Sequence, residues 1–420
     1  MMRLTNMTRR VPLAVMLTVA AVLTACSSSK SSPTSAAQSG PGLGVAKAAT
    51  GASVKIGYMT DGKTAGIDNS SEVPAAQAAA KYINGYLGGV GGHPIELDVC
   101  DDHETPSGAT DCGNQFVTDK VPAVLYNVSG QGAPLFKVLQ TANIPLIAYG
   151  SIDQSTLLAK TGAYVLTNGL VTAFAGPAKI GQMAGAKHGA EIVSDVPAAS
   201  GPAKALDPIL YKNAGMTVDV IAIAPGTADP TPQIQAELNK NPDQFHIVGD
   251  VSLCTSAIKA IKTLGFTKPI IVITQCISSS SAASIPGGYT GMKLVAANTV
   301  DPTDADVKIY LAAMKAYASS TPPFVNGVTQ GGFATVLGFA RAMTGATGDI
   351  TAASVASSLT SMSPQPLPFG TGITFQCNGS QVAITPSVCS TGALEATLDH
   401  AGNPVGAFTP LDAAPLLKLG

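Results

Sequence analysis

The sequence predicts an α/β protein made of two Rossmann-like lobes, each with a parallel sheet at its centre. Apolar stretches typical of buried strands alternate with helical stretches of about 10–15 residues, which is the pattern of βαβ units. This alternation restarts after Asn168. The chain has 420 residues, more than the roughly 250–300 at which a single core stops growing. These features together indicate two units of similar construction.

The first set of elements begins with a buried strand predicted over residues 54–59. A helix is predicted over residues 72–86, because Val73, Ala76 and Ala80 recur near one face. The set continues, in alternation, with strands over residues 94–99, 123–126 and 144–149 and helices over residues 110–118 and 133–142.

The second set begins with a helix predicted over residues 175–188. Strands rich in Val and Ile follow, and a helical stretch precedes each of them. These strands are predicted over residues 190–193, 217–223, 245–248 and 270–274. The two sets therefore predict two parallel sheets that are covered by helices.

The N-terminus has the pattern of an export signal. Three arginines precede an apolar run over residues 11–23, which is too short to span a bilayer and is typical of a signal-peptide core. The run ends in Leu-Thr-Ala followed by Cys26, which resembles the bacterial lipoprotein box and implies a lipid on the Cys26 thiol. The alternative is an ordinary signal peptide with a chance cysteine. Residues 26–50 are rich in Ser, Gly, Ala and Pro, which favours a flexible tether.

Six further cysteines agree with export. Outside the cytoplasm an even number of cysteines favours disulfides, although sequence alone leaves many pairings open. We favour pairing between nearest neighbours, because each couple brackets one short unit. The three couples are Cys100 with Cys112, Cys254 with Cys276, and Cys377 with Cys389. None has the short spacing of a zinc or redox site.

Composition and motifs exclude several function classes. The net charge is −2 and only 12% of residues are charged, which argues against nucleic-acid binding. The chain has no Gly-x-Ser-x-Gly nucleophile elbow, which is one common signature of an enzyme. The five histidines are not paired at metal-ligand spacing, and the polar cluster over residues 101–104 is interpreted as a solvated loop or a strand end rather than a metal site. We expect no catalysis, cofactor or metal.

Polar loops after two predicted strands indicate a ligand site, because ligands of open α/β sheets bind beyond the carboxyl ends of strands. Ser129, Gly130 and Gln131 precede a helix that has proline in its first turn. A hydroxyl and free backbone amides at this point suit a carboxylate. A simple helix cap is the alternative for Ser129. Asp61, after the first strand, is interpreted as a cap or turn residue.

The arrangement repeats one strand later. Tyr149, Gly150 and Ser151 again place small polar groups at the end of a predicted strand. Two such loops at neighbouring strands favour a ligand site over two coincidental caps. Tyr149 fits either a wall of the ligand site or ordinary packing, and Gln131 is either a ligand contact or an exposed glutamine.

Asn84, the run Gly-Gly-Val-Gly-Gly-His-Pro-Ile-Glu-Leu over residues 88–97, and Asp101 resemble the signature of type I periplasmic binding proteins. The nearest branch is the leucine/isoleucine/valine-binding family of ABC importers. Later segments match that family in order, so that the resemblance covers about residues 52–400: they are residues 129–134, 145–151, 243–249, 257–265 and 288–292.

The resemblance implies two lobes joined by a three-segment hinge, with crossings near residues 165–168, 295–298 and 365–370. The expected division gives a signal peptide and a tether followed by two discontinuous lobes. Its parts are residues 1–25 (signal peptide), 26–50 (tether), 51–166 with 298–366 (first lobe), and 167–297 with 367–420 (second lobe).

The resemblance also implies roles for individual residues. Ser129 and Gly130 match the positions that hold the ligand carboxylate. In the next loop the hydroxyl must come from Ser151, because Ile152 stands where threonine is common. In the second lobe, Ser200 matches a polar position, and Asp250 is the acid nearest to the family's usual glutamate.

The function implied is that of a monomeric receptor, anchored by lipid on the extracytoplasmic face of the cell membrane. It would bind a small polar solute, either branched-chain amino acid-like, a carboxylate or an amide. Its partners would be an ABC permease and an ATPase. The alternative is a ligand-sensing receptor subunit of a membrane signalling protein.

Overall fold

The first lobe is built around a parallel sheet with the strand order β2-β1-β3-β4-β5. The computed structural model describes residues 42–64, 67–324 and 327–418. The strands of this sheet within those residues are Val54–Thr60 (β1), Ile95–Asp101 (β2), Val124–Tyr126 (β3), Leu146–Ala148 (β4) and Ala163–Val165 (β5). The three strands after β2 are wholly buried, as is usual for parallel strands covered on both faces.

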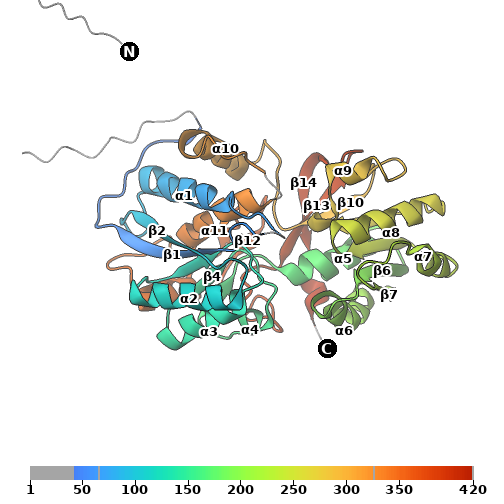
Figure 1. The fold of residues 1–420 in the computed structure, drawn as a ribbon, viewed down its shortest axis with the longest axis horizontal. Helices are drawn as coiled ribbons and strands as arrows, with labels where there is room; N and C mark the ends of the chain where they lie inside the picture. Colours follow the sequence, from blue (N-terminus) through green and yellow to red (C-terminus); the bar gives the residue numbers. More distant parts are fainter. Residues whose placement is uncertain (1–41, 65–66, 325–326, 419–420) are drawn as a thin grey trace, which may run out of the picture. The chain divides into compact units, whose positions relative to one another are not determined.

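Helices cover both faces of this sheet (Figure 1). One group lies on the side of α1, and the other group connects β2 to β5. The first group is α1 (Glu72–Tyr82) with its π-helical extension Ile83–Leu87, α10 (Ala305–Tyr317) and α11 (Val328–Ala342), and α12 (Ala352–Ser361) follows α11. The second group is α2 (Pro106–Thr118), α3 (Gly132–Ala142) and α4 (Gln154–Leu157).

The strand order of the first sheet creates a topological switch point. The chain leaves β1 for β2 on one side and later returns to β3 on the other side of β1. The loops that follow β1 and β3 therefore diverge at adjacent strand ends. In open α/β sheets this is the position at which ligands bind.

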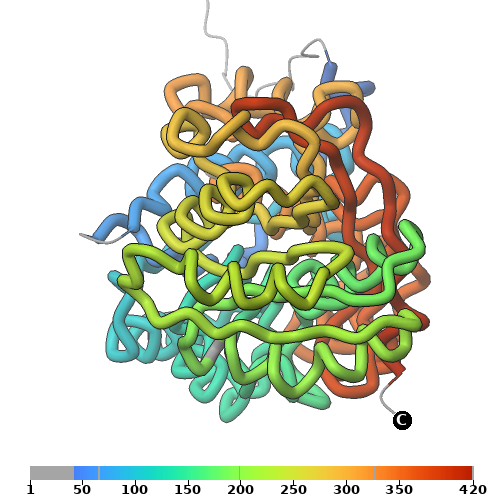
Figure 2. Tube along the Cα trace, turned by 90° about the vertical axis from the view of Figure 1, so that its right-hand side faces the viewer, coloured from blue at the N-terminus to red at the C-terminus, as the bar shows by residue number. Residues whose placement is uncertain are grey.

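The second lobe contains a sheet of order β14-β13-β10-β9-β8-β6-β7. Its parallel part, β7-β6-β8-β9-β10, repeats the strand order of the first sheet. The strands are His188–Ser194 (β6), Thr217–Ile223 (β7), Gln244–Val248 (β8), Ile270–Ile273 (β9), Lys293–Ala296 (β10), Gly392–Leu398 (β13) and Pro404–Asp412 (β14). The last two are antiparallel, and in Figure 2 this red pair lies beside the yellow and green segments of the lobe.

The helices of the second lobe begin with a π-helical turn, Val171–Ala175, that leads into α5. Helix α6 packs on β6 and β7. The remaining elements are α5 (Gly176–Met183), α6 (Pro197–Asn213), α7 (Thr231–Leu238), α8 (Val251–Thr263), α9 (Ser279–Ala282) and the short 3₁₀ turns Thr274–Cys276 and Ala414–Leu417.

The helix predicted over residues 175–188 was wrong in its last turn. Helix α5 ends at Met183, and Gly185 has a φ of 74°. A left-handed glycine just beyond the last turn is a common helix stop. His188 is consequently the first residue of β6 rather than part of a helix.

Within the described residues the chain passes between the two sheets after β5, after β10 and before β13. The third crossing was predicted at residues 365–370, and this position was wrong. Val388 forms a parallel bridge with Val165, so the chain remains beside the first sheet until Cys389. Before that it forms a small antiparallel pair, Gln365–Pro366 (β11) with Thr374–Phe375 (β12).

Hydrogen bonds join each crossing segment to a distant part of the chain. The Thr299 backbone N–H donates to the Phe369 carbonyl at 2.9 Å. The Asn168 side chain donates to the Ser390 carbonyl at 3.1 Å. These contacts join residues that are far apart in the sequence. The first and third crossings are bonded to each other, whereas the second is bonded to the segment beside the first sheet that precedes the third.

The six cysteines outside the N-terminal segment form three disulfides. Cys100 of β2 is bonded to Cys112 of α2, and Cys254 of α8 is bonded to Cys276. The third disulfide closes the loop between Cys377 and Cys389. The nearest-neighbour pairing is therefore confirmed.

The end of the predicted tether packs on the first lobe. Leu43 is buried, and the backbone of Lys47 and Ala49 donates to the carbonyls of Gly85 and Asn84 at 2.9 and 2.7 Å. A tether that reaches residue 50 was therefore wrong for these last residues. The signal peptide, Cys26 and the tether up to residue 41 lie outside the described residues. None of the described helices combines the length and the apolarity needed to cross a bilayer.

Candidate functional site

Asp61 and Ser129 meet at the switch point of the first sheet. Asp61 follows β1 and Ser129 follows β3, and the Ser129 Oγ donates a hydrogen bond to Asp61 Oδ1 at 2.5 Å. Both residues are buried, with exposed fractions of 4% and 3%. Asp61 was interpreted as a cap or turn residue, and that interpretation was wrong. It is instead the partner of the serine that the sequence singled out.

The hydrogen bonds around this pair fix the direction of the Ser129 hydroxyl. Its proton points to Asp61, while its oxygen accepts from the Gln131 backbone N–H at 2.9 Å. Asn69 donates to the other Asp61 oxygen at 3.3 Å. The helix-capping role proposed as the alternative for Ser129 is thus present in part, since Gln131 is the residue before α3.

Burial raises the pKa of Asp61, and the hydrogen bond from Ser129 opposes that shift. The charge of Glu104 raises the pKa further. The loop itself depends on Gly62, whose φ is 61° and where a Cβ atom would lie 2.0 Å from the Asp101 carboxylate. A side chain at this position would push the two acidic loops apart.

Two more buried carboxyls lie behind Asp61. Burial raises the pKa of Asp102 to about 7 and that of Glu72 to about 8. The Asn127 side chain donates to Glu72 at 3.2 Å. Among the described residues, no lysine or arginine forms an ion pair with Asp61, Asp102 or Glu72. The edge of the first sheet therefore collects carboxyl groups without a cationic side chain among the described residues.

The remaining predicted residues of the first polar loop differ in exposure. Gly130 is exposed, and a Cβ atom placed there would meet no atom within 4 Å. Gln131 donates through its side chain to the Glu104 carbonyl at 3.4 Å. A solute could therefore approach the backbone at Gly130 directly.

The second predicted loop lies beside the first, because the Gly150 N–H donates to the Asn127 carbonyl at 2.9 Å. Tyr149 is buried, and its hydroxyl donates to the Pro368 carbonyl at 3.1 Å. This is packing against a segment distant in the sequence. The Ser151 hydroxyl donates to Asp153 at 2.7 Å, so its proton is also committed to a carboxylate.

The residues predicted as ligand contacts in the second lobe form hydrogen bonds with the backbone of their own helices. Asp250 is exposed and caps α8 by accepting from the Leu253 N–H at 2.9 Å. Ser200 lies within α6 and donates to the Val196 carbonyl at 3.2 Å. Both hydrogen bonds stay within a few residues of the side chain that forms them.

Sequence reasoning missed the acidic partners of Ser129. In the sequence, Asp61 and residues 101–104 resemble ordinary loop or strand-end residues. Their position at the ends of β1 and β2, beside the switch point, is the signal that joins them to Ser129.

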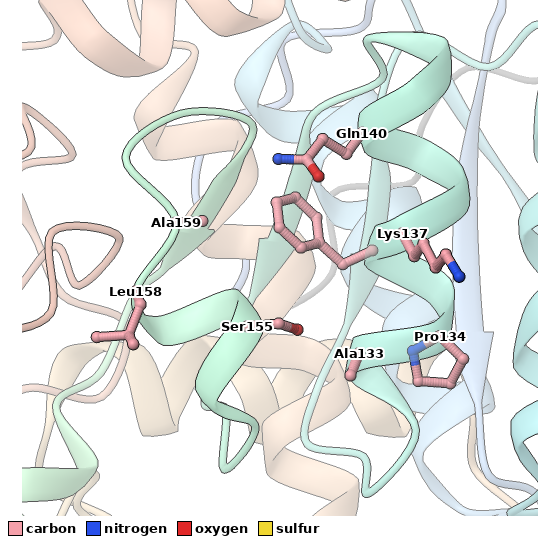
Figure 3. Close-up of a pocket in the computed structure, with 8 residues that line it drawn as sticks. Ala133, Pro134, Lys137, Gln140, Ser155, Leu158 and Ala159 are labelled. Carbon is pink, nitrogen blue, oxygen red and sulfur yellow. The ribbon is translucent and has the colours of Figure 1, made fainter.

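A separate surface pocket of about 490 Å³ lies between α3 and α4 (Figure 3). In this view Gln140 of α3 extends toward the segment that carries Ala159, whereas Lys137 points away from it. The pocket is lined by Ala133, Pro134, Phe136, Lys137, Gln140, Ser155, Leu158 and Ala159. It includes none of the predicted ligand residues.

Solved structures share this fold at low sequence identity. An ABC transporter substrate-binding protein from Sphaerobacter thermophilus superimposes with a TM-score of 0.67 at 17% identity, covering 85% of this chain and 98% of that one. The substrate-binding protein LivJ from Streptococcus pneumoniae, in complex with isoleucine, gives 0.61 at 16% identity, with 86% and 99% covered. The leucine-binding protein LivK from Thermotoga maritima gives 0.62 at 16% identity, with 84% and 98% covered.

A comparison with curated proteins finds no match. The family model described as "Periplasmic binding protein" matches residues 53–386, which is most of the chain. The chain therefore belongs to the periplasmic binding protein family, with the two-lobed type I fold of its leucine/isoleucine/valine-binding branch, and its role is to bind a solute rather than to catalyse a reaction.

Proposed function

We propose that this chain is a lipid-anchored extracytoplasmic receptor. In this proposal it binds a small polar solute at the switch point of the first sheet and delivers it to an ABC permease and its ATPase. Family membership supports the role in transport. The observation that carries the site is the buried hydrogen bond between Asp61 and Ser129. A buried carboxylate without a cationic partner is costly, and a solute that supplies N–H groups would offset that cost.

The direction of that hydrogen bond favours a solute with N–H donors. Ser129 has one hydroxyl proton, and it points to Asp61, so Ser129 offers none to a ligand carboxylate. The Asp61 oxygens and the Ser129 oxygen can accept. A simple carboxylate would also be repelled by Asp61. Among the solutes considered, we favour an amino acid or an amide over a carboxylate that lacks nitrogen.

A thermal-shift screen would test this preference with the mature chain. Amino acids, their amides and the matching carboxylates without nitrogen would be compared at equal concentration. A ligand that binds only the folded state raises the melting temperature by mass action. We expect the nitrogen-bearing members to raise it and Asp61→Asn to abolish the shift, with Asp349→Asn, an exposed acid, as the control. A shift from the nitrogen-free carboxylates alone would contradict the preference.

We further propose that the lobes close over the solute by bending at the three crossing segments. The first boundary stays near residue 166 and the second near residue 298. We place the third near residue 390, because the bridge to Val165 holds the preceding chain on the first lobe. Small-angle scattering should show a smaller radius of gyration with ligand, from a monomer. An unchanged radius at saturation would contradict closure.

The proposed lipid anchor can be tested separately from the solute site. Expression of the full chain in a bacterium should give a membrane-bound form whose mass includes a lipid on Cys26. Cys26→Ala should release the protein from the membrane, since the described helices include no membrane span. If the wild-type chain left the membrane as readily as the Cys26→Ala variant, the lipid anchor would be contradicted. The proposal for the solute site would not be affected by that result.

A further inference from the structure

Three side chains from three elements of the second lobe meet at one edge of its sheet. His188 begins β6, Asp219 lies on β7 and Glu237 lies on α7. The His188 Nε2 atom is 3.3 Å from an Asp219 oxygen and 3.3 Å from a Glu237 oxygen. The ligand-type atoms of the three residues all lie within 4.8 Å of one another. These residues lie far apart in the sequence, so no spacing motif reveals the cluster.

Hydrogen bonds assign the proton on the other ring nitrogen. The Thr217 hydroxyl donates to the Lys187 carbonyl at 3.4 Å, which leaves its oxygen to accept from His188 Nδ1 at 3.0 Å. A neutral imidazole with its proton on Nδ1 presents a lone pair at Nε2. That lone pair would face two carboxylate oxygens. The arrangement therefore requires a positive charge beside these oxygens, which a proton on Nε2, a metal ion or a neighbouring ammonium group can supply.

The spacing of these atoms agrees with a metal ion. Zinc binds nitrogen and oxygen at about 2.0–2.1 Å, so neighbouring ligands in a tetrahedral site lie roughly 3.3–3.4 Å apart. The two separations from His188 Nε2 match this value. As direct hydrogen bonds, both would be longer than the usual 2.7–3.2 Å or so. Thr217 supplies the hydrogen bond that commonly orients a metal-binding histidine.

We propose that His188, Asp219 and Glu237 form a zinc site, in which water completes the coordination. Without the metal, Lys240 supplies the positive charge. Its Nζ lies 2.9 Å from Glu237 and 3.1 Å from Asp219. The Lys240 side chain is half exposed and can move into solvent, whereas the Glu237 carboxylate is buried and remains in place. The metal would join β6, β7 and α7, on a lobe separate from the solute site.

Isothermal titration of the metal-free mature chain with zinc chloride would test the site. We expect one zinc ion per chain. His188→Gln should weaken binding by at least roughly 10-fold, the lower limit reported for the loss of supporting residues. Lys240→Met should strengthen binding, because it removes the competing cation.

His103→Gln is the matched control, because His103 faces a single carboxylate, Asp101, at 3.2 Å. It should leave zinc binding unchanged. The proposal fails if no zinc binds, or if His188→Gln and Glu237→Gln both leave the affinity unchanged while each variant keeps the circular dichroism spectrum of the wild type. A loss caused by His103→Gln alone would assign the ion elsewhere and would also overturn it.

Discussion

The loops after β1 and β3 in the first lobe and those after β6 and β8 in the second occupy equivalent positions in two sheets of the same strand order. In the first lobe, Asp61 and Ser129 are buried and bonded to each other across the switch point. In the second, Asp195 and Asp250 are exposed. Asp195 pairs with Lys204 at 3.6 Å, and Asp250 caps its own helix.

This comparison shows that similar acidic and hydroxyl residues have different roles in the two lobes. Asp250 and Ser200 satisfy backbone groups a few residues away, which stabilises a helix but leaves little for a ligand. Asp61 and Ser129 join loops that are far apart in the sequence, and no lysine or arginine in the described part of the chain pairs with Asp61. We infer that the first lobe makes the main polar contacts with the solute and that the second lobe mainly covers it.

The lobes also differ in where their buried acids lie. Those of the first lobe surround the switch point, whereas Glu191, Asp207 and His246 of the second lobe are fully buried between α6 and the sheet. Burial raises the pKa of Glu191 to about 7 and that of Asp207 to about 11, and it lowers the pKa of His246 to about 4. The second group is therefore expected to affect stability rather than binding.

The largest expected effect is the loss of solute binding in Asp61→Ala. Removing one member of a buried, hydrogen-bonded charge contact typically costs 2–5 kcal/mol, so we expect the dissociation constant to rise by roughly 100-fold. Isothermal titration with a ligand identified in the screen measures it. A change of less than about threefold would show that the two switch points do not differ in the proposed way.

The next effect is a fall in stability as the pH rises from about 6.5 to 8. Asp207 holds a proton in the folded state up to pH 11 or so, but releases it near pH 4 when unfolded, so the folded state is progressively disfavoured at higher pH. Each such group contributes up to about 1.4 kcal/mol per pH unit. His246 acts in the opposite sense, but only between about pH 4 and its unfolded pKa of about 6.5.

Urea unfolding at several pH values would measure this fall, to which Asp207 alone should contribute about 2 kcal/mol. Asp207→Asn, which cannot ionise, should reduce the fall by that amount, while Glu72, whose pKa is raised to about 8, continues to contribute. Asp349→Asn, on the surface, should leave it as in the wild type. If Asp207→Asn kept the full slope, the dependence would have to be assigned to the acids of the first lobe instead.

A smaller loss of affinity is expected for Ser129→Ala. The substitution removes a hydrogen bond to a charged group, which is worth about 1.5–3 kcal/mol at most, and Asp61 would still be present to accept from the solute. We expect the dissociation constant to rise by about 10-fold. Ser361→Ala, whose hydroxyl donates within α12, is the control. Equal binding by wild type and Ser129→Ala would remove the serine from the site.

The smallest effect is expected for Asp250→Ala. Loss of a helix cap costs about 1 kcal/mol of stability, so the urea midpoint should fall slightly. Because the carboxylate is exposed and engaged by the Leu253 N–H, the dissociation constant should change by less than about threefold. A large loss of affinity would mean that the second lobe binds the solute through this acid.

Much of the fold could be predicted from the sequence, because strand and helix periodicity are local properties. The strand predicted over residues 217–223 agrees with β7 at both ends. The helix end near His188 was missed, since it depends on the left-handed conformation of Gly185. The third crossing was missed because it depends on pairing between Val165 and Val388, which no local pattern encodes.

Only part of the candidate site could be predicted from the sequence. Ser129 was recognised from its place between a strand and a helix, but its partner Asp61 lies on a different loop and resembles an ordinary turn residue. Tyr149 is a similar case, because the sequence leaves its role open between ligand wall and packing. Only the fold shows that its hydroxyl donates to the Pro368 carbonyl and that the side chain packs there. Partners brought together by topology require the strand order, which the sequence alone does not give.

The most direct test of the central claim is a crystal structure with a bound ligand from the screen. We expect a ligand nitrogen within about 3.2 Å of an Asp61 oxygen, with the Ser129 oxygen in reach of the same group. A ligand held by Asp250 without contact to Asp61, or seated in the pocket between α3 and α4, would contradict the claim.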